Sequence, residues 1–303
     1  ASRDICLRTK DVFQLLAPQL GVSMTGGNAV LGQGGTLGGI GHFTVEARAI
    51  AVMGDIPSIG DWSAPSTTPP SGQQLESKNF PIGLPAVDGA IGIFKGLPLG
   101  VTNVGGIDLL VSAAYVPEYK NADGTFSVTP EQNLKFGYGA RVGLLQESLL
   151  VPGVSATWMK RDLPTTTMTG ASTVGTSSMA FTLADAAVKT TAWRVVASKS
   201  LIMFGLAIGA GQDSYDQSAV FSGSATTPLS PTATNFGPFT LDNKMTRTNY
   251  FANASINILL LKIVGEIGQV SGGEVTPTPF NTFSSGAADD TRLYGSFGLR
   301  FTW

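Results

Sequence analysis

Apolar and polar residues alternate one by one over several stretches of this chain. The clearest stretch is 292–303, where one face holds Leu293, Gly295, Phe297, Leu299, Phe301 and Trp303, and the other holds Arg292, Tyr294, Ser296, Gly298, Arg300 and Thr302. A period of two is the spacing of a β-strand whose two faces meet different surroundings. The pattern therefore predicts a strand over 292–303.

The same alternation recurs along most of the chain. It is strong over 42–53, 134–144, 202–210 and 247–258, and weaker over 87–95, 107–116, 153–162, 180–198 and 261–270. Together with 292–303 these stretches predict about ten strands, within a range of eight to twelve.

The links between the expected strands alternate in length. The long links are roughly 54–86, 117–133, 163–179, 211–243 and 271–290; the short links are 96–106, 145–153, 199–201 and 259–261. Tight periplasmic turns alternating with extended outer loops are typical of membrane barrels. The long links, among them SAPSTTPPSG at 63–72, are rich in Ser, Thr, Pro and Gly, so we expect exposed, weakly ordered loops. We also expect both chain ends on the short-turn side, which requires an even number of strands.

Composition narrows the fold class. Charged residues make up 13% of the chain, about half of the usual share in soluble proteins. No apolar run approaches the ~18 residues of a membrane helix, and a bilayer otherwise admits only closed barrels. We therefore expect an all-β, antiparallel up-and-down transmembrane β-barrel with apolar side chains toward lipid. The rival fold is a soluble sandwich, in which those side chains would form a dry core.

Residues 1–41 differ from the rest and form a separate expected unit before the barrel at 42–303. Apolar residues over 11–20 follow helical spacing, with Thr9 as a candidate cap and Pro18 limiting the helix. A Gly-rich, nearly uncharged stretch follows it. We expect a plug in the lumen or a periplasmic segment; an added strand or a flexible leader are alternatives.

The inward faces of the strands would carry most of the charges. The candidate lumen-lining residues are Glu46, Arg48, Lys135, Arg141, Arg194, Arg247, Lys262, Glu266, Arg292 and Arg300, together with Arg161, Asp88 and Asp108. Basic groups exceed acidic ones, so a water-filled lumen would favour anions. A ten-stranded barrel is narrow, however, and small barrels fill their interior with side chains. Pairing into a structural network is therefore favoured over conduction.

Candidate chemistry is sparse. The chain has one His, His42, and one Cys, Cys6, and it lacks a Gly-x-Ser-x-Gly motif. We therefore expect no catalytic residues, no metal site and no cofactor. The net charge of −2 gives no reason to expect a nucleic acid partner. Residues 1–10 lack the apolar core of a signal peptide, so we expect a mature chain from which that peptide has been removed.

The C-terminal stretch RLYGSFGLRFTW resembles the C-terminal signal of bacterial outer-membrane barrels. That resemblance implies that Phe297, Leu299, Phe301 and Trp303 are read by the barrel-assembly machinery. It also implies an outer-membrane location, with the lipid bilayer and lipopolysaccharide as surroundings.

The amino end is similar to the start of the long-chain fatty-acid transporter family. A short helix, a Gly-rich stretch and a first strand near HFTVEARAIAV carry this likeness. In that family the N-terminal segment sits inside the barrel as a hatch. This chain departs from the family because it is shorter, has fewer expected strands and retains only Asn28 and Ala29 of the Asn-Pro-Ala-type motif.

Three functions follow as expectations. The first is passive uptake of a small apolar or amphipathic molecule through an outer-membrane barrel. The alternative is a structural or adhesive surface barrel with a filled lumen, whose Ser/Thr/Pro-rich loops contact an envelope partner or a second copy. A surface hydrolase is the third possibility, and the single His disfavours it.

Overall fold

A computed structural model describes residues 2–57, 72–174, 177–227, 230–275 and 278–303. The one long helix among them is α1 (Ser2–Thr25). The long strands are β1 (Phe43–Pro57), β3 (Ser77–Phe94), β6 (Gly106–Tyr115), β9 (Leu134–Leu145), β10 (Gly153–Asp162), β12 (Ser177–Leu201), β13 (Phe204–Thr227), β14 (Ser230–Ile258), β15 (Leu261–Ser271) and β17 (Arg292–Thr302). The shorter strands are β2 (Gln74–Leu75), β4 (Leu97–Leu99), β5 (Thr102–Val104), β7 (Tyr119–Lys120), β8 (Phe126–Pro130), β11 (Thr166–Val174) and β16 (Thr282–Phe283).

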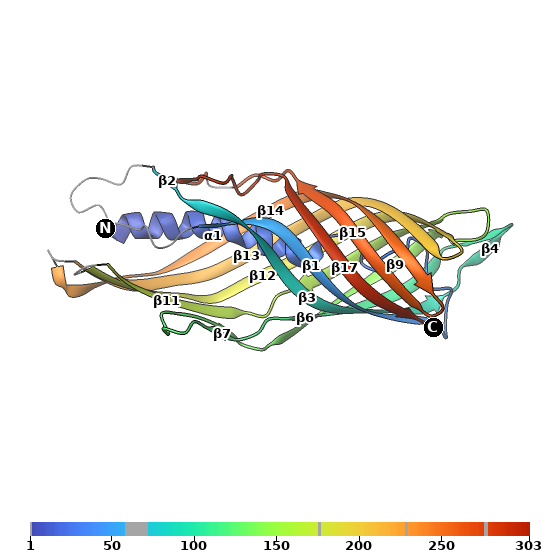
Figure 1. Ribbon diagram of the computed structural model, residues 1–303, viewed down its shortest axis with the longest axis horizontal. Helices are drawn as coiled ribbons and strands as arrows, with labels where there is room; N and C mark the ends of the chain where they lie inside the picture. Colours follow the sequence, from blue (N-terminus) through green and yellow to red (C-terminus); the bar gives the residue numbers. More distant parts are fainter. Residues whose placement is uncertain (1, 58–71, 175–176, 228–229, 276–277) are drawn as a thin grey trace.

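The long strands close into a ring (Figure 1). Within the described residues the order is β1-β3-β6-β9-β10-β12-β13-β14-β15-β17, and β1 pairs with β17 to complete the circle. Each of these neighbouring pairs is antiparallel. The predicted up-and-down barrel of ten strands is therefore confirmed.

The two faces of the ring separate apolar from charged side chains. Along β1 exposed and buried residues alternate over almost the whole strand. Phe297 and Leu299 on β17 are 58% and 52% exposed, whereas Glu46 and Arg48 on β1 are 2% and 4% exposed. Apolar residues thus face outward and charges face inward, which excludes a sandwich with an apolar core. Among the described residues, no helix is long and apolar enough to cross a membrane.

The outer face changes character along four neighbouring strands. Trp158, Trp193, Gln212 and Thr248 are register partners on β10, β12, β13 and β14. Beyond this row, away from the short turns, the outward residues become polar and then charged, and Lys244 Nζ lies 3.2 Å from Asp216 Oδ2. Aromatic residues mark bilayer interfaces in membrane barrels. The Trp row therefore marks one edge of the apolar band, which extends from there to the short turns.

Helix α1 is longer than the sequence predicted and runs inside the ring. Thr9 lies within the helix, and Pro18 interrupts it without ending it. A proline removes one helical hydrogen bond and costs about 3 kcal/mol, so surrounding contacts must hold the helix. It contacts β1, β3, β10, β12, β13 and β14, and Leu15, Gln19 and Val22 are almost fully buried.

The path of the first residues corrects the expectation that both chain ends lie on the short-turn side. In Figure 1 the start of α1 lies at the long-loop end, whereas the C-terminus lies at the short-turn end. The strand β1 begins beside the C-terminus, where Phe43 N donates to Trp303 O over 3.0 Å. The residues before β1 therefore run through the barrel from one end to the other.

Parts of the long links are strands, which corrects the expectation of weakly ordered loops. The segments 163–179 and 211–243 lie largely in β11, β12, β13 and β14, which extend the sheet beyond the ring. One face of this extension carries Ser and Thr side chains that meet water, and the other packs on α1 through Phe221 and Phe236. Most of the stretch 63–72 lies outside the described residues.

Candidate functional site

Residues 26–41, which connect α1 to β1, are here named the inner segment. It has no helix or strand, and residues 26–32 are all buried. Buried backbone amides and carbonyls need hydrogen-bond partners, and the segment supplies only some of them itself, such as Val30 O for Gln33 N. The strands of the barrel wall supply many of the others.

Basic side chains of the wall bind the carbonyls. Arg194 donates from Nε to Gly27 O over 3.1 Å and from Nη2 to Thr25 O, at the end of α1, over 3.0 Å. Arg48 Nη1 donates to Asn28 O over 2.9 Å. Arg300 donates to Leu31 O, and Lys262 Nζ lies 3.4 Å from Gly32 O. Cations at a helix C-terminus also interact favourably with the helix dipole.

Acidic side chains of the wall accept from the amides. Asn28 N donates to Glu266 Oε2 over 2.9 Å, and Leu31 N donates to Glu46 Oε2 over 3.1 Å. Leu37 N donates to both oxygens of Asp108 over 3.2 and 3.1 Å. The wall thus offers donors to carbonyls and acceptors to amides, as a partner strand would.

The same charges also pair with one another. The buried ion pairs are Arg48–Asp88 (2.7 Å), Arg161–Asp88 (3.1 Å), Arg141–Asp108 (2.7 Å), Arg194–Asp213 (2.5 Å) and Arg292–Asp55. A buried charge left unpaired is strongly destabilising, so these pairs hold the wall side chains in place. The name wall network is used below for the wall residues that contact the inner segment. They are the paired residues Arg48, Asp108 and Arg194, together with Glu46, Glu266 and Arg300.

An apolar patch lies beside the wall network. Ala29 and Val30 of the inner segment pack against Ala90, Leu110 and Met159 of the wall. The inner segment therefore meets charged groups on one side and apolar groups on another.

The inner segment is tightly fitted at Gly27. Its φ is +78°, and a Cβ there would lie 1.6 Å from Glu266 Oε1. A residue with a side chain would need the left-handed conformation that glycine adopts readily, and it would also displace Glu266. The position therefore requires glycine.

Polar contacts also anchor helix α1, on the side of the inner segment that is nearer the long-loop end. Gln19 accepts from Asp55 N over 2.6 Å and donates to Asp55 O over 3.2 Å. Asp11 accepts from the backbone amides of Phe280 and Asn281. Asp11 is buried, and this desolvation raises its pKa above the ordinary value, although the hydrogen bonds from Asn281 and Phe280 oppose the rise.

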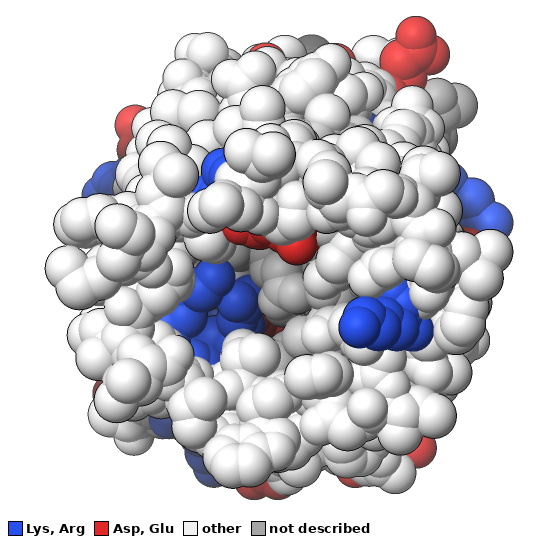
Figure 2. Space-filling view, turned by 90° about the vertical axis from the view of Figure 1, so that its right-hand side faces the viewer, with Lys and Arg blue, Asp and Glu red and all other residues white. Residues whose placement is uncertain are grey.

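The short-turn end of the barrel is hollowed. Figure 2 shows a depression at this end with basic side chains on its wall and acidic side chains beside them. Arg300 and Lys262 lie near this end of β17 and β15, and they are register partners. Basic side chains therefore connect this end of the barrel to the inner segment, because Arg300 and Lys262 donate to the carbonyls of Leu31 and Gly32.

The structure divides the predicted lumen-lining residues into three groups. Glu46, Arg48, Arg141, Arg194, Lys262, Glu266 and Arg300 contact the inner segment or a wall residue that holds it. Arg247 and Arg292 instead donate to carbonyls of the loop 287–290 near the long-loop end. Lys135 alone forms the third group: it is exposed at the start of β9, so the prediction that it lines the lumen is wrong.

Two buried carboxylates, Asp55 and Asp213, were not among the candidate residues. The expected first strand ended at 53 and the expected strand over 202–210 ended before Asp213, although both strands continue. The signal was present, because Gly211, Asp213 and Tyr215 continue the inward face of β13.

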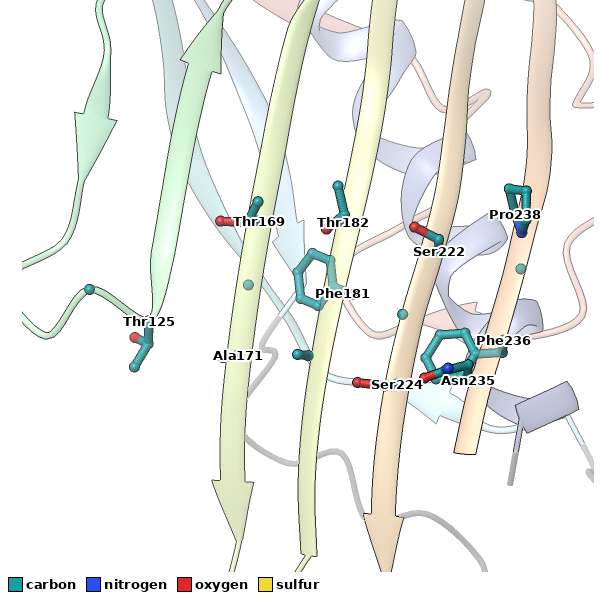
Figure 3. A pocket seen from close by; sticks show the side chains of 15 residues that line it. Thr125, Thr169, Ala171, Phe181, Thr182, Ser222, Ser224, Asn235, Phe236 and Pro238 are labelled. Atoms are coloured by element: carbon teal, nitrogen blue, oxygen red, sulfur yellow. The ribbon is translucent and has the colours of Figure 1, made fainter. Parts of the chain in front are cut away.

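A second candidate site lies on the extension of the sheet beyond the ring. A groove of about 520 Å³ crosses β11, β12, β13 and β14. Figure 3 shows Thr169, Thr182 and Ser222 side by side on adjacent strands, with Ser224 farther along the strand of Ser222 and Asn235 on the next strand. The outward face is thus an array of small hydroxyl groups, which donate and accept hydrogen bonds.

Among the described residues, no group of three or more His, Cys, Asp or Glu side chains is placed to hold a metal ion. His42 is exposed at the turn before β1. Cys6 on α1 is partly buried, which raises the pKa of its thiol.

Comparison with known proteins gives only distant likenesses. No family model and no curated protein matches the chain. Among solved structures, the chain is similar to OmpT of Vibrio cholerae, described as outer-membrane expressed, with 9% identity, coverage of 86% of this chain and 97% of that chain, and a TM-score of 0.23. The transport unit of the autotransporter AIDA-I from Escherichia coli shares 7% identity, with coverage of 86% and 89% and a TM-score of 0.30. OpdK of Pseudomonas aeruginosa, solved with vanillate, shares 8% identity, with coverage of 87% and 99% and a TM-score of 0.16. Likenesses this weak carry no argument, so the closed antiparallel ring itself assigns the chain to the transmembrane β-barrels.

Proposed function

We propose that this chain is a bacterial outer-membrane barrel that admits a small amphipathic molecule when the inner segment moves. The lipid bilayer and lipopolysaccharide would surround its apolar band. The inner segment would then be a gate, and no catalytic step is part of the proposal.

The observation that supports a gate is how the inner segment is held. Its backbone is bound by side chains of the wall, and not by a paired strand or a helix of its own. Each such bond contributes only about 0.5–1.5 kcal/mol net, or somewhat more with a charged partner. A ligand that offers equivalent groups could therefore replace these bonds.

Unpaired polar atoms near the inner segment also support movement. Within the described part of the chain, Glu46 Oε1, Arg141 Nη1 and Ser255 Oγ are buried without a hydrogen-bond partner. Native proteins rarely leave buried polar groups unpaired. These atoms are suited to bind water or a polar ligand group.

The amphipathic class follows from what the inner segment covers. Its removal would expose the wall network together with the apolar patch of Ala90, Leu110 and Met159. A molecule with one apolar part and one polar part would match both surfaces.

Variants that loosen the inner segment test this proposal. Arg194→Gln and Glu266→Gln remove charged contacts to Gly27 and Asn28. In planar bilayers we expect more frequent opening events for these variants than for the wild type. Asp216→Asn is the matched control because it alters an ion pair on the outer face. Equal conductance of all four proteins would exclude the gate.

The substrate class needs a separate assay. Proteoliposomes would be tested for entry of p-nitrophenyl glucoside, which is amphipathic, and of maltose, which is polar and of similar size. We expect Arg194→Gln to increase entry of the glycoside more than entry of maltose. Equal increases would indicate an unselective pore.

The hydroxyl groove supports a second candidate function, a surface barrel that contacts an envelope partner or a second copy. Thr182 and Ser222 present hydroxyl groups in the middle of this groove. Thr182→Val with Ser222→Ala would remove these hydroxyls with little change of volume. Under this function, the pair should weaken cell-to-cell adhesion or crosslinking to neighbouring proteins, while bilayer conductance stays unchanged.

A further inference from the structure

All four short turns carry exposed apolar side chains at their tips. We name these residues the apolar rim: Leu97, Leu99, Val101, Leu149, Leu150, Ile202, Met203, Leu259 and Leu260. Ile202 and Leu259 are 99% and 100% exposed. Turns that face water are usually built from Gly, Asn, Asp, Ser and Pro, so the apolar rim is not explained by turn formation.

The backbone conformation of two of these turns is also unfavourable for the residues that they contain. Ile202 has a φ of 51° and Leu259 has a φ of 54°. A positive φ is uncommon for any residue other than glycine, and it is a genuine outlier for a β-branched one. Asn or Gly would fit both positions without strain. Ile and Leu there are unfavourable for the turn and for contact with water, so another environment must favour them.

We propose that the apolar rim is seated in the hydrocarbon of the inner leaflet, so that the short turns anchor the barrel in lipid. The proposal rests on the membrane location of the barrel and not on uptake. The turns would then be part of the membrane-embedded surface and would not project into the periplasm.

The length of the apolar band identifies lipid as the partner of the rim. A tilted strand needs roughly 9–11 residues to cross the hydrocarbon. On β12 the band runs from Trp193 to Leu201, and on β13 it runs from Phe204 to Gln212. Neither stretch exceeds that requirement, so the hydrocarbon must reach the turns themselves.

The charge distribution agrees with this placement. In Figure 2 uncharged residues make up most of the face around the hollow, and a basic side chain lies at its edge. Beyond the Trp row Asp216 pairs with Lys244. Between this row and the turns Lys199 faces outward and donates from Nζ to the carbonyls of Ser148 and Leu149, so that its charge is held by the turn. Lys95 is exposed beside the first short turn. The outer surface between the Trp row and the rim is therefore mostly apolar, and its two lysines lie next to the short turns, where a long lysine side chain can reach polar groups.

A depth measurement tests the proposal on the full-length protein. Ile202→Cys and Leu259→Cys would each be made with Cys6→Ser, labelled with an environment-sensitive fluorophore and reconstituted in phosphatidylcholine vesicles. We expect strong quenching by lipids brominated on their acyl chains and weak quenching by aqueous iodide. Ile208→Cys, in the apolar band, is the lipid-exposed control, and Ser224→Cys, on the sheet extension, is the water-exposed control.

Two results would overturn the proposal. Iodide quenching at positions 202 and 259 equal to that at position 224 would place the rim in water. Protection from both quenchers, with crosslinks between copies through these cysteines, would show that a second copy covers the rim. Neither result depends on whether any solute passes the barrel, so failure here is separable from failure of the gate.

Vesicle thickness gives an independent measurement. A double variant in the first turn, Ile202→Asn with Met203→Gly, suits the turn backbone and shortens the apolar surface; Leu259→Asn with Leu260→Gly does the same in the second. A mismatch between apolar height and bilayer thickness is unfavourable. Folding yield over phosphatidylcholines of increasing chain length should therefore peak at shorter chains for these variants than for the wild type. An unchanged optimum would count against anchoring by the rim.

Discussion

Arg194 on β12 and Asp213 on β13 form an ion pair inside the barrel, with Arg194 Nη2 2.5 Å from Asp213 Oδ1. The same guanidinium binds the last carbonyl of α1 and the carbonyl of Gly27. One pair of neighbouring strands therefore holds both the end of the helix and the start of the inner segment.

Replacing Arg194 by Gln should destabilise the protein strongly. The change leaves Asp213 buried and without its cation, and breaking a buried pair costs about 3–5 kcal/mol. Asp216→Asn removes a pair whose side chains are 54% and 76% exposed, and such a pair contributes about 0–1 kcal/mol. Urea unfolding in vesicles measures both values. Similar losses for the two variants would contradict the role given to Arg194.

Gly21 should tolerate no side chain while Tyr215 is present. A Cβ at position 21 would lie 2.7 Å from Cδ1 of Tyr215, and overpacking costs about 1–3 kcal/mol. Gly21→Ala should therefore reduce the protection of α1 from hydrogen exchange. In a Tyr215→Leu background the same change should stabilise the helix by about 1 kcal/mol, because Ala favours helix. Gly265→Ala, with open space at its Cβ position, is the neutral control.

The free energy of unfolding should fall as pH rises through the pKa of Asp11, because burial disfavours its ionised carboxylate more than the hydrogen bonds from Phe280 and Asn281 favour it. Burial raises the pKa of Asp11 above its ordinary value of 3.8, so the folded state binds this proton more tightly than the unfolded state. The contribution is complete below about pH 3.8 and is lost as pH rises through the raised value. Unfolding free energies of wild type and Asp11→Asn over this range measure it. The variant should lack this part of the pH dependence.

A charge in the apolar band should oppose insertion according to its position along one strand. Ile208 and Ser214 both face outward on β13, on opposite sides of the Trp row. Ile208→Arg should cost about 2–4 kcal/mol, whereas Ser214→Arg should cost about 0–1 kcal/mol. Folding equilibria into vesicles provide the comparison. Equal costs would show that the Trp row does not mark the edge of the hydrocarbon.

The C-terminal residues should matter more for assembly in cells than for the folded barrel. Phe301 is partly exposed and Trp303 is 61% exposed, so neither fills the interior. Phe301→Ala with Trp303→Ala should lower the amount of protein in the outer membrane while leaving refolding into vesicles nearly unchanged. Membrane fractionation and vesicle refolding measure the two effects. An equal loss in both would indicate a structural role instead.

The sequence allowed the ring to be predicted because lipid and lumen impose opposite demands on alternate residues. That contrast is strongest in the membrane, so the strands were recognised there and missed beyond it. In β14, Thr234 and Asn235 extend a sheet both of whose faces can hold small polar groups, and no contrast marks them as strand.

The sequence does not show which side chains contact one another inside the barrel. The faces of Arg194 and Asp213 follow from alternation, but their register depends on how β12 and β13 pair. The inner segment has no periodicity because its partners are wall side chains from distant parts of the chain. The helix likewise continues past Pro18 because of contacts with the wall, which local propensity does not contain.

The route of α1 and the inner segment sets an order of events in assembly. The seam between β1 and β17 joins the first and last strands of the ring, and the end of α1 and the inner segment occupy the space that this seam encloses. A helix that fills the bore cannot easily be inserted sideways into a closed cylinder. We therefore expect the amino-terminal residues to enter the barrel before β1 pairs with β17. Pairing of these two strands would then enclose them.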